Sequence, residues 1–248
     1  MGNRLVYKFF IEDKAFDGNI VKITGDNQKH IGNVLRMKAG DEIYLVNKEN
    51  GKCYKCILTT FSKDNILAEI LEEEENNMEP KVKVDLFQGI TKADKLEYVI
   101  QKSVELGVNK IFPVRMKNCI AIIKDEAKKN ERWNKISEAA AKQSKRGIIP
   151  KVENTVDISY ICDSIEKYDL VIVAYENEEK NTIKEILQEY KETKNIAIII
   201  GPEGGIEGKE IEKMLCAGAK AVTLGSRILR TETAPIAVLS MIMYEYDL

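Results

Sequence analysis

The stretch NIAIIIGPEGGIEGKEIEKMLCAGA, residues 195–219, joins a strand, a glycine-rich loop and a helix. Residues 196–200 are a continuous run of Ile and Ala, which is typical of a strand buried on both faces of a parallel sheet. The glycines at 201, 204 and 205 then mark a loop, and the residues from 207 onward indicate a helix. The stretch therefore predicts an α/β domain whose sheet is mainly parallel.

The same alternation continues on both sides of this stretch. Each strand-like segment is followed by a segment with helical spacing of apolar residues; Leu96, Val99 and Ile100 are examples. The expected strands are 81–90, 109–116, 169–176 and 220–225, and the expected helices are 92–107, 125–146, 181–191 and 234–246.

Residues 1–71 have a different pattern, with short alternating strands that predict a small β domain. One helix is expected at 25–40, with Asp26 as its cap. Residues 72–79, EEEENNME, form a charged linker that Pro80 closes. We therefore expect two domains, 1–71 and 80–248.

Composition places the chain among soluble globular proteins, with 44% hydrophobic and 31% charged residues. The N-terminal stretch lacks the apolar segment of a signal peptide, and the apolar runs fall short of a membrane span. We expect a cytoplasmic protein that does not contact a membrane. Cys53 and Cys56 form a CxxC without a second ligand pair, so we interpret them as strand residues and expect no metal site.

Charge is unevenly distributed along the chain. Residues 80–150 contain 16 Lys/Arg against 8 Asp/Glu, whereas residues 151–248 contain 11 against 18. A locally basic region can bind a polyanion even when the net charge is only −2. Solvated helix faces explain the same distribution equally well.

Ligands of open α/β sheets bind beyond the C-terminal ends of the strands. Here three such ends are unusual: 174–176, 200–205 and 223–235, the last reading TLGSRILRTETAP. The glycine-rich loop lacks both the GxGxxG fingerprint and a phosphate-binding loop, and it carries Glu203. It therefore favours a neutral or cationic ligand, although GPEGG alone is as often a tight turn.

Several motifs in register resemble the ribosomal RNA small subunit methyltransferase E (RsmE) family of the SPOUT superfamily. They are HIGNVLR (30–36) with Arg4, ELGVNKIFP (105–113), EAAAKQSKRGIIP (138–150), GPEGGIEGKE (201–210) and LGSRILRTETA (224–234). Two departures are Ile206, where Phe or Leu is usual, and KNC (117–119), which lacks the Arg-Ser that often follows the second strand.

The resemblance implies a PUA-like β-barrel domain, an α/β SPOUT domain with a C-terminal trefoil knot, and a homodimer. It implies S-adenosylmethionine (SAM) as cofactor and N3 of a uridine in 16S rRNA, free or in the small ribosomal subunit, as the methylation site. By match, the cofactor-binding residues are Ala174, Tyr175, Glu176, Ile200, Gly201, Pro202, Gly204, Gly205, Leu224, Gly225, Ile228, Leu229 and Thr231.

Methyl transfer to N3 requires alignment of the base, loss of the N3 proton and stabilisation of charge on the uracil oxygens. The chain has one histidine, His30, so a histidine base in the α/β domain is excluded. Arg230 is the candidate for stabilising the uridinate and Glu232 for handling the proton. An alternative for Glu232 is a structural acid paired with an arginine.

The candidates for RNA contacts are basic or polar residues from both expected domains: Arg4, Arg36, Lys92, Lys95, Gln143, Arg146 and Arg227, with Lys142, Lys145 and His30 as further possibilities. Gln143 could instead pack at a dimer interface, and His30 could be a structural residue. Two other functions stay open: a knotted methyltransferase acting on tRNA or on a ribose 2′-OH, and a non-catalytic rRNA-binding assembly factor.

Overall fold

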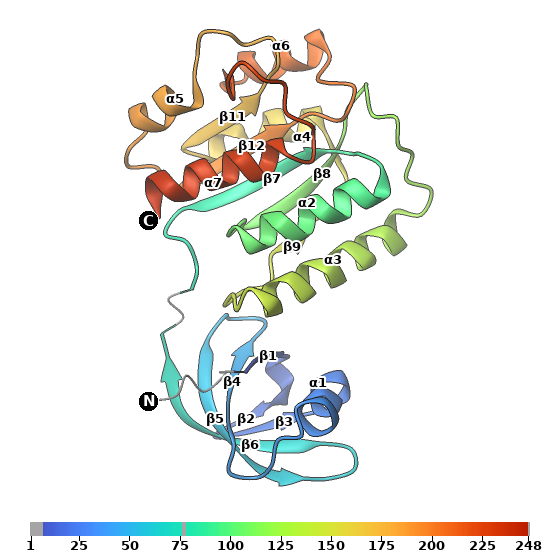
Figure 1. Ribbon diagram of the computed structural model, residues 1–248, viewed down its shortest axis with the longest axis vertical. Coiled ribbons are helices and arrows are strands. Elements are labelled where there is room, and N and C mark those ends of the chain that lie inside the picture. Colours follow the sequence, from blue (N-terminus) through green and yellow to red (C-terminus); the bar gives the residue numbers. More distant parts are fainter. Residues whose placement is uncertain (1–6, 76–77, 248) are drawn as a thin grey trace. The chain divides into compact units, whose positions relative to one another are not determined.

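The computed structural model describes residues 7–75 and 78–247. The chain divides into two compact units, and the division is not a single cut along the sequence. The first unit comprises residues 1–79 together with 142–149, and the second comprises 80–141 together with 150–248 (Figure 1).

The first unit is a six-stranded sheet in the order β1-β4-β5-β6-β3-β2. Its elements are β1 (Lys8–Ile11), β2 (Phe16–Asp17), β3 (Ile20–Ile23), α1 (Gly25–Lys29), β4 (Glu42–Asn47), β5 (Cys53–Phe61) and β6 (Ile66–Glu74). The pair β1 and β4 is parallel and the other pairs are antiparallel. Alternate strand residues such as Val21, Ile43 and Leu45 build its apolar core, which confirms the small β domain.

The helix expected at 25–40 is shorter and less regular than predicted. α1 ends at Lys29, and a π-helical turn follows at His30–Val34, in which the Leu35 N–H donates to the His30 carbonyl over 2.9 Å. Arg36 then ends the segment in the left-handed region, with φ 54°. Asp26 lies inside the first turn, and Thr24 occupies the cap position.

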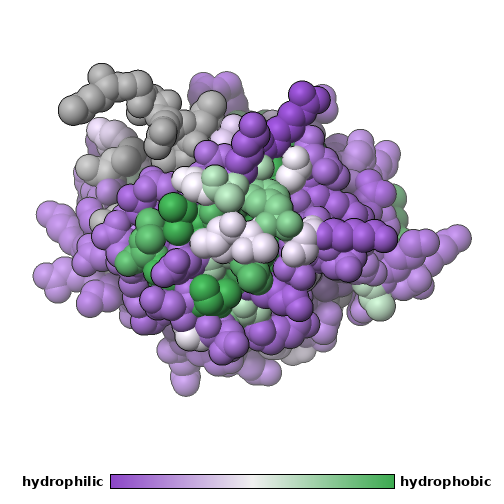
Figure 2. All heavy atoms as spheres, turned by 90° about the horizontal axis from the view of Figure 1, so that it is seen from below, coloured by the Kyte–Doolittle hydropathy of each residue, from purple (hydrophilic) through white to green (hydrophobic). Residues whose placement is uncertain are grey.

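Apolar side chains gather on one face of the first unit inside a rim of hydrophilic ones, as Figure 2 shows. The exposed large apolar side chains among its described residues are Ile20, Val34, Phe61, Leu71 and Met78.

Two segments far apart in sequence meet in the first unit. The Arg146 guanidinium pairs with the Glu79 carboxylate, which also accepts hydrogen bonds from the backbone N–H groups of Gly147 (2.7 Å) and Ile148 (3.2 Å). The arginine side chain is only 4% exposed.

β6 continues to Glu74, three residues into the stretch expected to be a linker.

The second unit contains a parallel sheet of seven strands. Six follow the order β10-β8-β7-β12-β11-β13, and β9 pairs with β8. The strands are β7 (Lys83–Gly89), β8 (Lys110–Arg115), β9 (Lys151–Val152), β10 (Val156–Asp157), β11 (Leu170–Ala174), β12 (Asn195–Ile200) and β13 (Lys220–Val222). Every pairing is parallel, so the α/β domain predicted from residues 195–219 is confirmed.

Helices cover both faces of this sheet (Figure 1). They are α2 (Ala93–Glu105), α3 (Glu126–Gln143), α4 (Ile158–Ser164), α5 (Ile183–Glu189), α6 (Gly208–Cys216) and α7 (Ala234–Tyr246). α2 contacts α7, and α4 contacts α6. α4 and α6 bury Ile161 and Met214 against strand residues such as Phe87 and Val173. α4 was not predicted, because seven residues are too few to show helical periodicity.

α7 has the bounds predicted for the last helix. Its residues Leu239, Ile242 and Met243 are buried within the unit. Met241 and Tyr244 are the large exposed apolar side chains of its described residues.

No helix within residues 7–75 and 78–247 is both long and apolar enough to span a lipid bilayer. The five cysteines are free thiols, and Cys53 and Cys56 are buried in β5, as expected of strand residues.

Candidate functional site

The C-terminal ends of four neighbouring strands lie level with one another. Ala174 at the end of β11 is in register with both Ile200 of β12 and Val222 of β13, and Ile200 is in register with Gln88 of β7. The loops that leave β11, β12 and β13 therefore start side by side. Loops at this edge of a parallel sheet are where ligands bind in α/β proteins.

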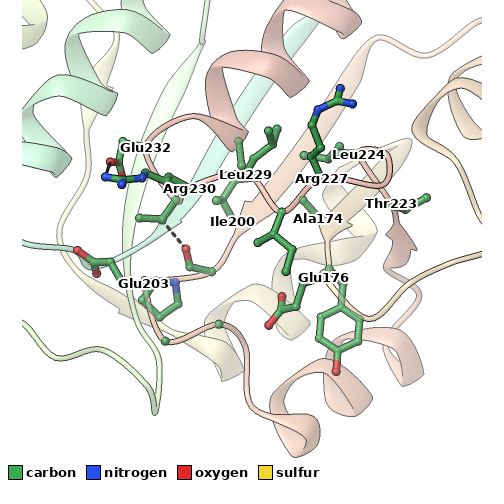
Figure 3. A pocket seen from close by; sticks show the side chains of 18 of the residues that line it. Ala174, Glu176, Ile200, Glu203, Thr223, Leu224, Arg227, Leu229, Arg230 and Glu232 are labelled. Atoms are coloured by element: carbon green, nitrogen blue, oxygen red, sulfur yellow. Dashed lines mark hydrogen bonds and ion pairs between the residues drawn. The ribbon is translucent and has the colours of Figure 1, made fainter.

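These three loops enclose a cavity of about 590 Å³, within the range of small-molecule sites. All the residues that the resemblance assigned to cofactor binding line it, from Ala174 on the first loop to Thr231 on the third. Arg230 and Glu232 line it as well. Figure 3 shows Arg230, Glu232 and Glu203 toward one side of the cavity, with Leu224, Arg227 and Thr223 toward the other.

The glycine-rich loop fits tightly between its neighbours. A Cβ atom added at Gly201 would lie 2.8 Å from Cγ1 of Ile206, and one added at Gly205 would lie 2.3 Å from Oε1 of Glu176. Gly205 also has φ +70°, which disfavours any residue with a side chain. Glycine is therefore favoured at 201 by the contact with Ile206 and at 205 by the backbone conformation.

Two hydrogen bonds of Thr231 connect the loop after β13 to the loop after β12 and to β7. The Thr231 hydroxyl donates to the Gly201 carbonyl over 2.6 Å and accepts a hydrogen bond from Gln88 Nε2 over 3.0 Å. The Gln88 side chain is fully buried at the end of β7. Because the Gly201 carbonyl already has this partner, it has one lone pair left for a ligand.

Four charged side chains meet at one side of the cavity. Lys95 Nζ lies 3.3 Å from Glu232 Oε2 and 3.5 Å from Glu203 Oε1, and Arg230 Nη1 lies 3.9 Å from Glu232 Oε1. Desolvation lowers the pKa of Lys95, but its interactions with Glu232 and Glu203 outweigh this effect, and the pKa is raised. The Arg230 side chain is 82% exposed, so its guanidinium can reach a further partner.

Comparison with known proteins identifies relatives of this chain. The sequence pattern of the family described as RNA methyltransferase domain matches residues 78–243, and that of the RNA methyltransferase PUA domain matches residues 23–71. The Bacillus subtilis ribosomal RNA small subunit methyltransferase E is 34% identical to this chain, and the match covers 97% of each. The chain belongs to the ribosomal RNA small subunit methyltransferase E family.

Two solved structures of similar proteins contain SAM. The Neisseria gonorrhoeae ribosomal RNA small subunit methyltransferase E, bound to SAM, has a TM-score of 0.84 and 32% identity, covering 96% of this chain and 97% of that one. A methyltransferase from Legionella pneumophila, in complex with SAM, has a TM-score of 0.82, 30% identity and the same coverage. A PUA-like domain followed by a parallel α/β SPOUT domain is thus the fold of this chain. The trefoil knot implied by the resemblance stays a prediction.

The residues expected to contact RNA in this family member are placed in different settings. Lys95 and Arg227 line the cavity, and Lys92 is exposed at the start of α2. Arg36 and Gln143 are exposed in the first unit, and Arg4 lies outside the described residues.

One of these expectations changes with the structure. Arg146 is buried and paired with Glu79, so its guanidinium is not placed to meet an RNA phosphate. His30 is exposed and its ring packs against that of Phe9 with centroids 5.8 Å apart, so an RNA contact and a structural role both stay open for it.

Sequence reasoning missed several residues of the site. Glu203, Thr223 and Ala234 line the cavity, and so does Lys95, which the sequence suggested only as an RNA contact. Glu203, Thr223 and Ala234 lie within or next to the quoted motifs, so their position in the sequence could have predicted them. Gln88 gave no such signal, because it is one polar residue in an apolar strand and only the fold places it beside Thr231. No three His, Cys, Asp or Glu side chains of the described part of the chain gather as a metal site.

Proposed function

We propose that this protein transfers a methyl group from SAM to N3 of a uridine in small-subunit ribosomal RNA. The observation that carries the proposal is the cavity at the ends of β11, β12 and β13, which brings together three loops far apart in sequence. Membership of the ribosomal RNA small subunit methyltransferase E family supports the reaction and the class of substrate.

The residues of the cavity fit SAM in shape and in charge. Glycines leave its floor open to close approach by a flat ligand, and Leu224, Ile228 and Leu229 offer apolar surface for an adenine. Ile228 is 86% exposed, so a ligand in the cavity would cover an apolar side chain that otherwise faces water. The carboxylates of Glu176 and Glu203 favour a cationic ligand. When bound, SAM supplies the methyl group on a positively charged sulfur.

The charged side of the cavity then serves the substrate. Arg230 is the exposed cation, and its planar guanidinium can donate to the uracil oxygens as they gain charge. Glu232 lies between Lys95 and Arg230, and this position supports the role of a carboxylate that orients the arginine. We therefore propose that Glu232 orients Arg230 and does not itself accept the N3 proton.

RNA binding is proposed for exposed basic residues in both units. We propose that Lys92 and Arg227, which are both exposed, contact RNA phosphates, and that Arg36, which is exposed in the first unit, contacts them as well. Gln143 stays a candidate for a base contact or for a dimer interface. We also propose a homodimer, supported by the exposed Met241 and Tyr244 on α7. Light scattering at micromolar concentration should give twice the mass of the chain, and a monomer would contradict the dimer.

Mass spectrometry of rRNA nucleosides tests the proposed function directly. Small-subunit RNA from cells that lack this protein should contain no N3-methyluridine at the target, and the purified protein with SAM should restore it. Methylation of tRNA or of a ribose 2′-OH instead would establish the alternative substrate. Absence of SAM binding in calorimetry would favour the non-catalytic assembly factor.

A further inference from the structure

Asn118, which does not line the cavity, donates hydrogen bonds to the backbone of the glycine-rich loop. Asn118 follows β8 in the loop that leads to α3, and its side-chain Nδ2 donates to two successive carbonyls, those of Gly204 at 3.1 Å and Gly205 at 3.3 Å. One amide group therefore satisfies two backbone acceptors of the loop. An asparagine NH₂ has two donor hydrogens, so both bonds can form together.

Its neighbour Lys117 secures the other end of the same loop. The Lys117 backbone N–H donates to Glu210 Oε1 over 2.9 Å, and its Nζ lies 2.7 Å from Glu207 Oε1. Glu207 and Glu210 form the capping box that starts α6 directly after the glycines. The segment 117–118 thus contacts the loop 204–210 at both ends.

The fit leaves the loop little freedom to move. A Cβ atom at Gly204 would lie 2.9 Å from both Cβ and the carbonyl oxygen of Asn118. On the other side of the loop, Glu176 approaches Gly205 closely. The loop is therefore enclosed between Asn118 and a residue that lines the cavity.

The geometry points to Asn118 as a positioning residue for the SAM pocket of this chain. By orienting the carbonyls of Gly204 and Gly205, it fixes the conformation in which the loop presents its other face to the cavity. This inference rests on the proposed function.

Two substitutions separate the contributions of the amide. Asn118→Ala removes both donors, and Asn118→Asp keeps the shape while directing a carboxylate at two carbonyl oxygens. Loss of two neutral hydrogen bonds predicts SAM binding weaker by about tenfold for the alanine variant. The aspartate variant should lose more, because repulsion is added to the loss. Asn154→Ala and Asn154→Asp are matched controls, since Asn154 is exposed between β9 and β10.

Calorimetry measures the SAM affinity of each variant. Amide hydrogen exchange is measured on the same proteins without ligand. Exchange at residues 203–206 should be faster in both Asn118 variants and unchanged in the Asn154 variants. At saturating SAM, kcat should stay within about twofold while the KM for SAM rises, because the effect lies in binding. A residue with only a structural role would lower Tm without this split between KM and kcat.

Three outcomes would overturn the inference: unchanged exchange, unchanged SAM affinity despite faster exchange, or a fall in kcat without a change in KM. If the unsubstituted protein failed to bind SAM, the proposed function would fail and so would the link from Asn118 to SAM. The exchange experiment would still decide whether Asn118 holds the loop.

Discussion

The loops that follow β12 and β13 line the same cavity, but the fold holds them very differently. In the first, the carbonyls of Gly201, Gly204 and Gly205 each accept a side-chain hydrogen bond. In the second, residues 225–228 are exposed, and a Cβ atom added at Gly225 would meet nothing within 4 Å. One loop is packed on both sides, and the other is open to solvent.

The difference fits two kinds of ligand. A wall built from fixed backbone groups suits a single small-molecule ligand, because a preorganised site loses less entropy when the ligand binds. The exposed arginines of the second loop, Arg227 and Arg230, suit a large substrate that arrives from solvent. We therefore expect substitutions in the first loop to affect cofactor affinity and substitution of Arg230 in the second to affect turnover.

Gly201→Val should have the largest effect. The new side chain would press on Ile206, whose Cγ1 would be 2.8 Å from Cβ, and would displace the loop that the cavity needs. We expect SAM affinity to fall by about a hundredfold or more, because the insertion of an isopropyl group into a packed site forces backbone shifts. Calorimetry measures this, and circular dichroism verifies that the variant is folded. Gly208→Val is the control, since a Cβ there meets nothing within 4 Å. Equal loss in both variants would show that contact with Ile206 is not the cause of the weaker binding.

Arg230→Ala tests the open loop. If Arg230 stabilises charge in the transition state, kcat should fall by about a hundredfold while SAM affinity changes by less than about twofold. Arg230→Lys should recover only part of the activity, because an ammonium lacks the planar fork of a guanidinium. Single-turnover kinetics and calorimetry on the same samples separate the two quantities. Loss of SAM binding in Arg230→Ala would place the arginine in the cofactor pocket and contradict its role in turnover.

Glu232→Gln should have a smaller effect on turnover than Arg230→Ala. A carboxylate that orients Arg230 and Lys95 can be replaced by a neutral amide at a cost of about tenfold in kcat. The acidic limb of the pH–rate profile should then persist in the variant. Loss of most activity together with that limb would instead identify Glu232 as the general base.

The same substitution should change how stability depends on pH, and this is the smallest effect. The carboxylates raise the pKa of Lys95 above its ordinary value of 10.5 despite desolvation, so they stabilise the folded protein only while Lys95 is charged. Their contribution is complete below pH 10.5 and disappears as the pH rises through the folded-state pKa. Glu232→Gln should therefore have a lower Tm than the unsubstituted protein at pH 8, and this difference in Tm should narrow as the pH rises above 10.5. A difference that does not vary with pH would exclude this ion pair as its cause.

The sequence predicted much of the fold because its strands are long apolar runs and its main helices are strongly periodic. α7 has the predicted bounds, and the parallel sheet follows from strands buried on both faces. Short elements such as α4 and the π-helical turn at His30 have too few residues to show a period.

Site residues were predictable where they share a motif, and unpredictable where only the fold joins them. The loop 200–205 and the segment 224–231 were recognised from local sequence. Asn118 and Gln88 contact these loops from positions 86 and 143 residues away along the chain, which no local pattern can show. Arg146 was misjudged because a basic sequence motif does not reveal that Glu79 neutralises it.

The first unit is completed by residues 142–149, which the ribosome makes long after residue 79. The Glu79 carboxylate gains these partners only after Arg146, Gly147 and Ile148 have been synthesised. The first unit therefore cannot complete its fold when only residues 1–79 have left the ribosome. An excised fragment ending at residue 79 should accordingly be more susceptible to proteases than the same fragment with 142–149 joined by a flexible linker. Transfer of this domain to another protein therefore requires two gene segments, which encode residues 1–79 and 142–149.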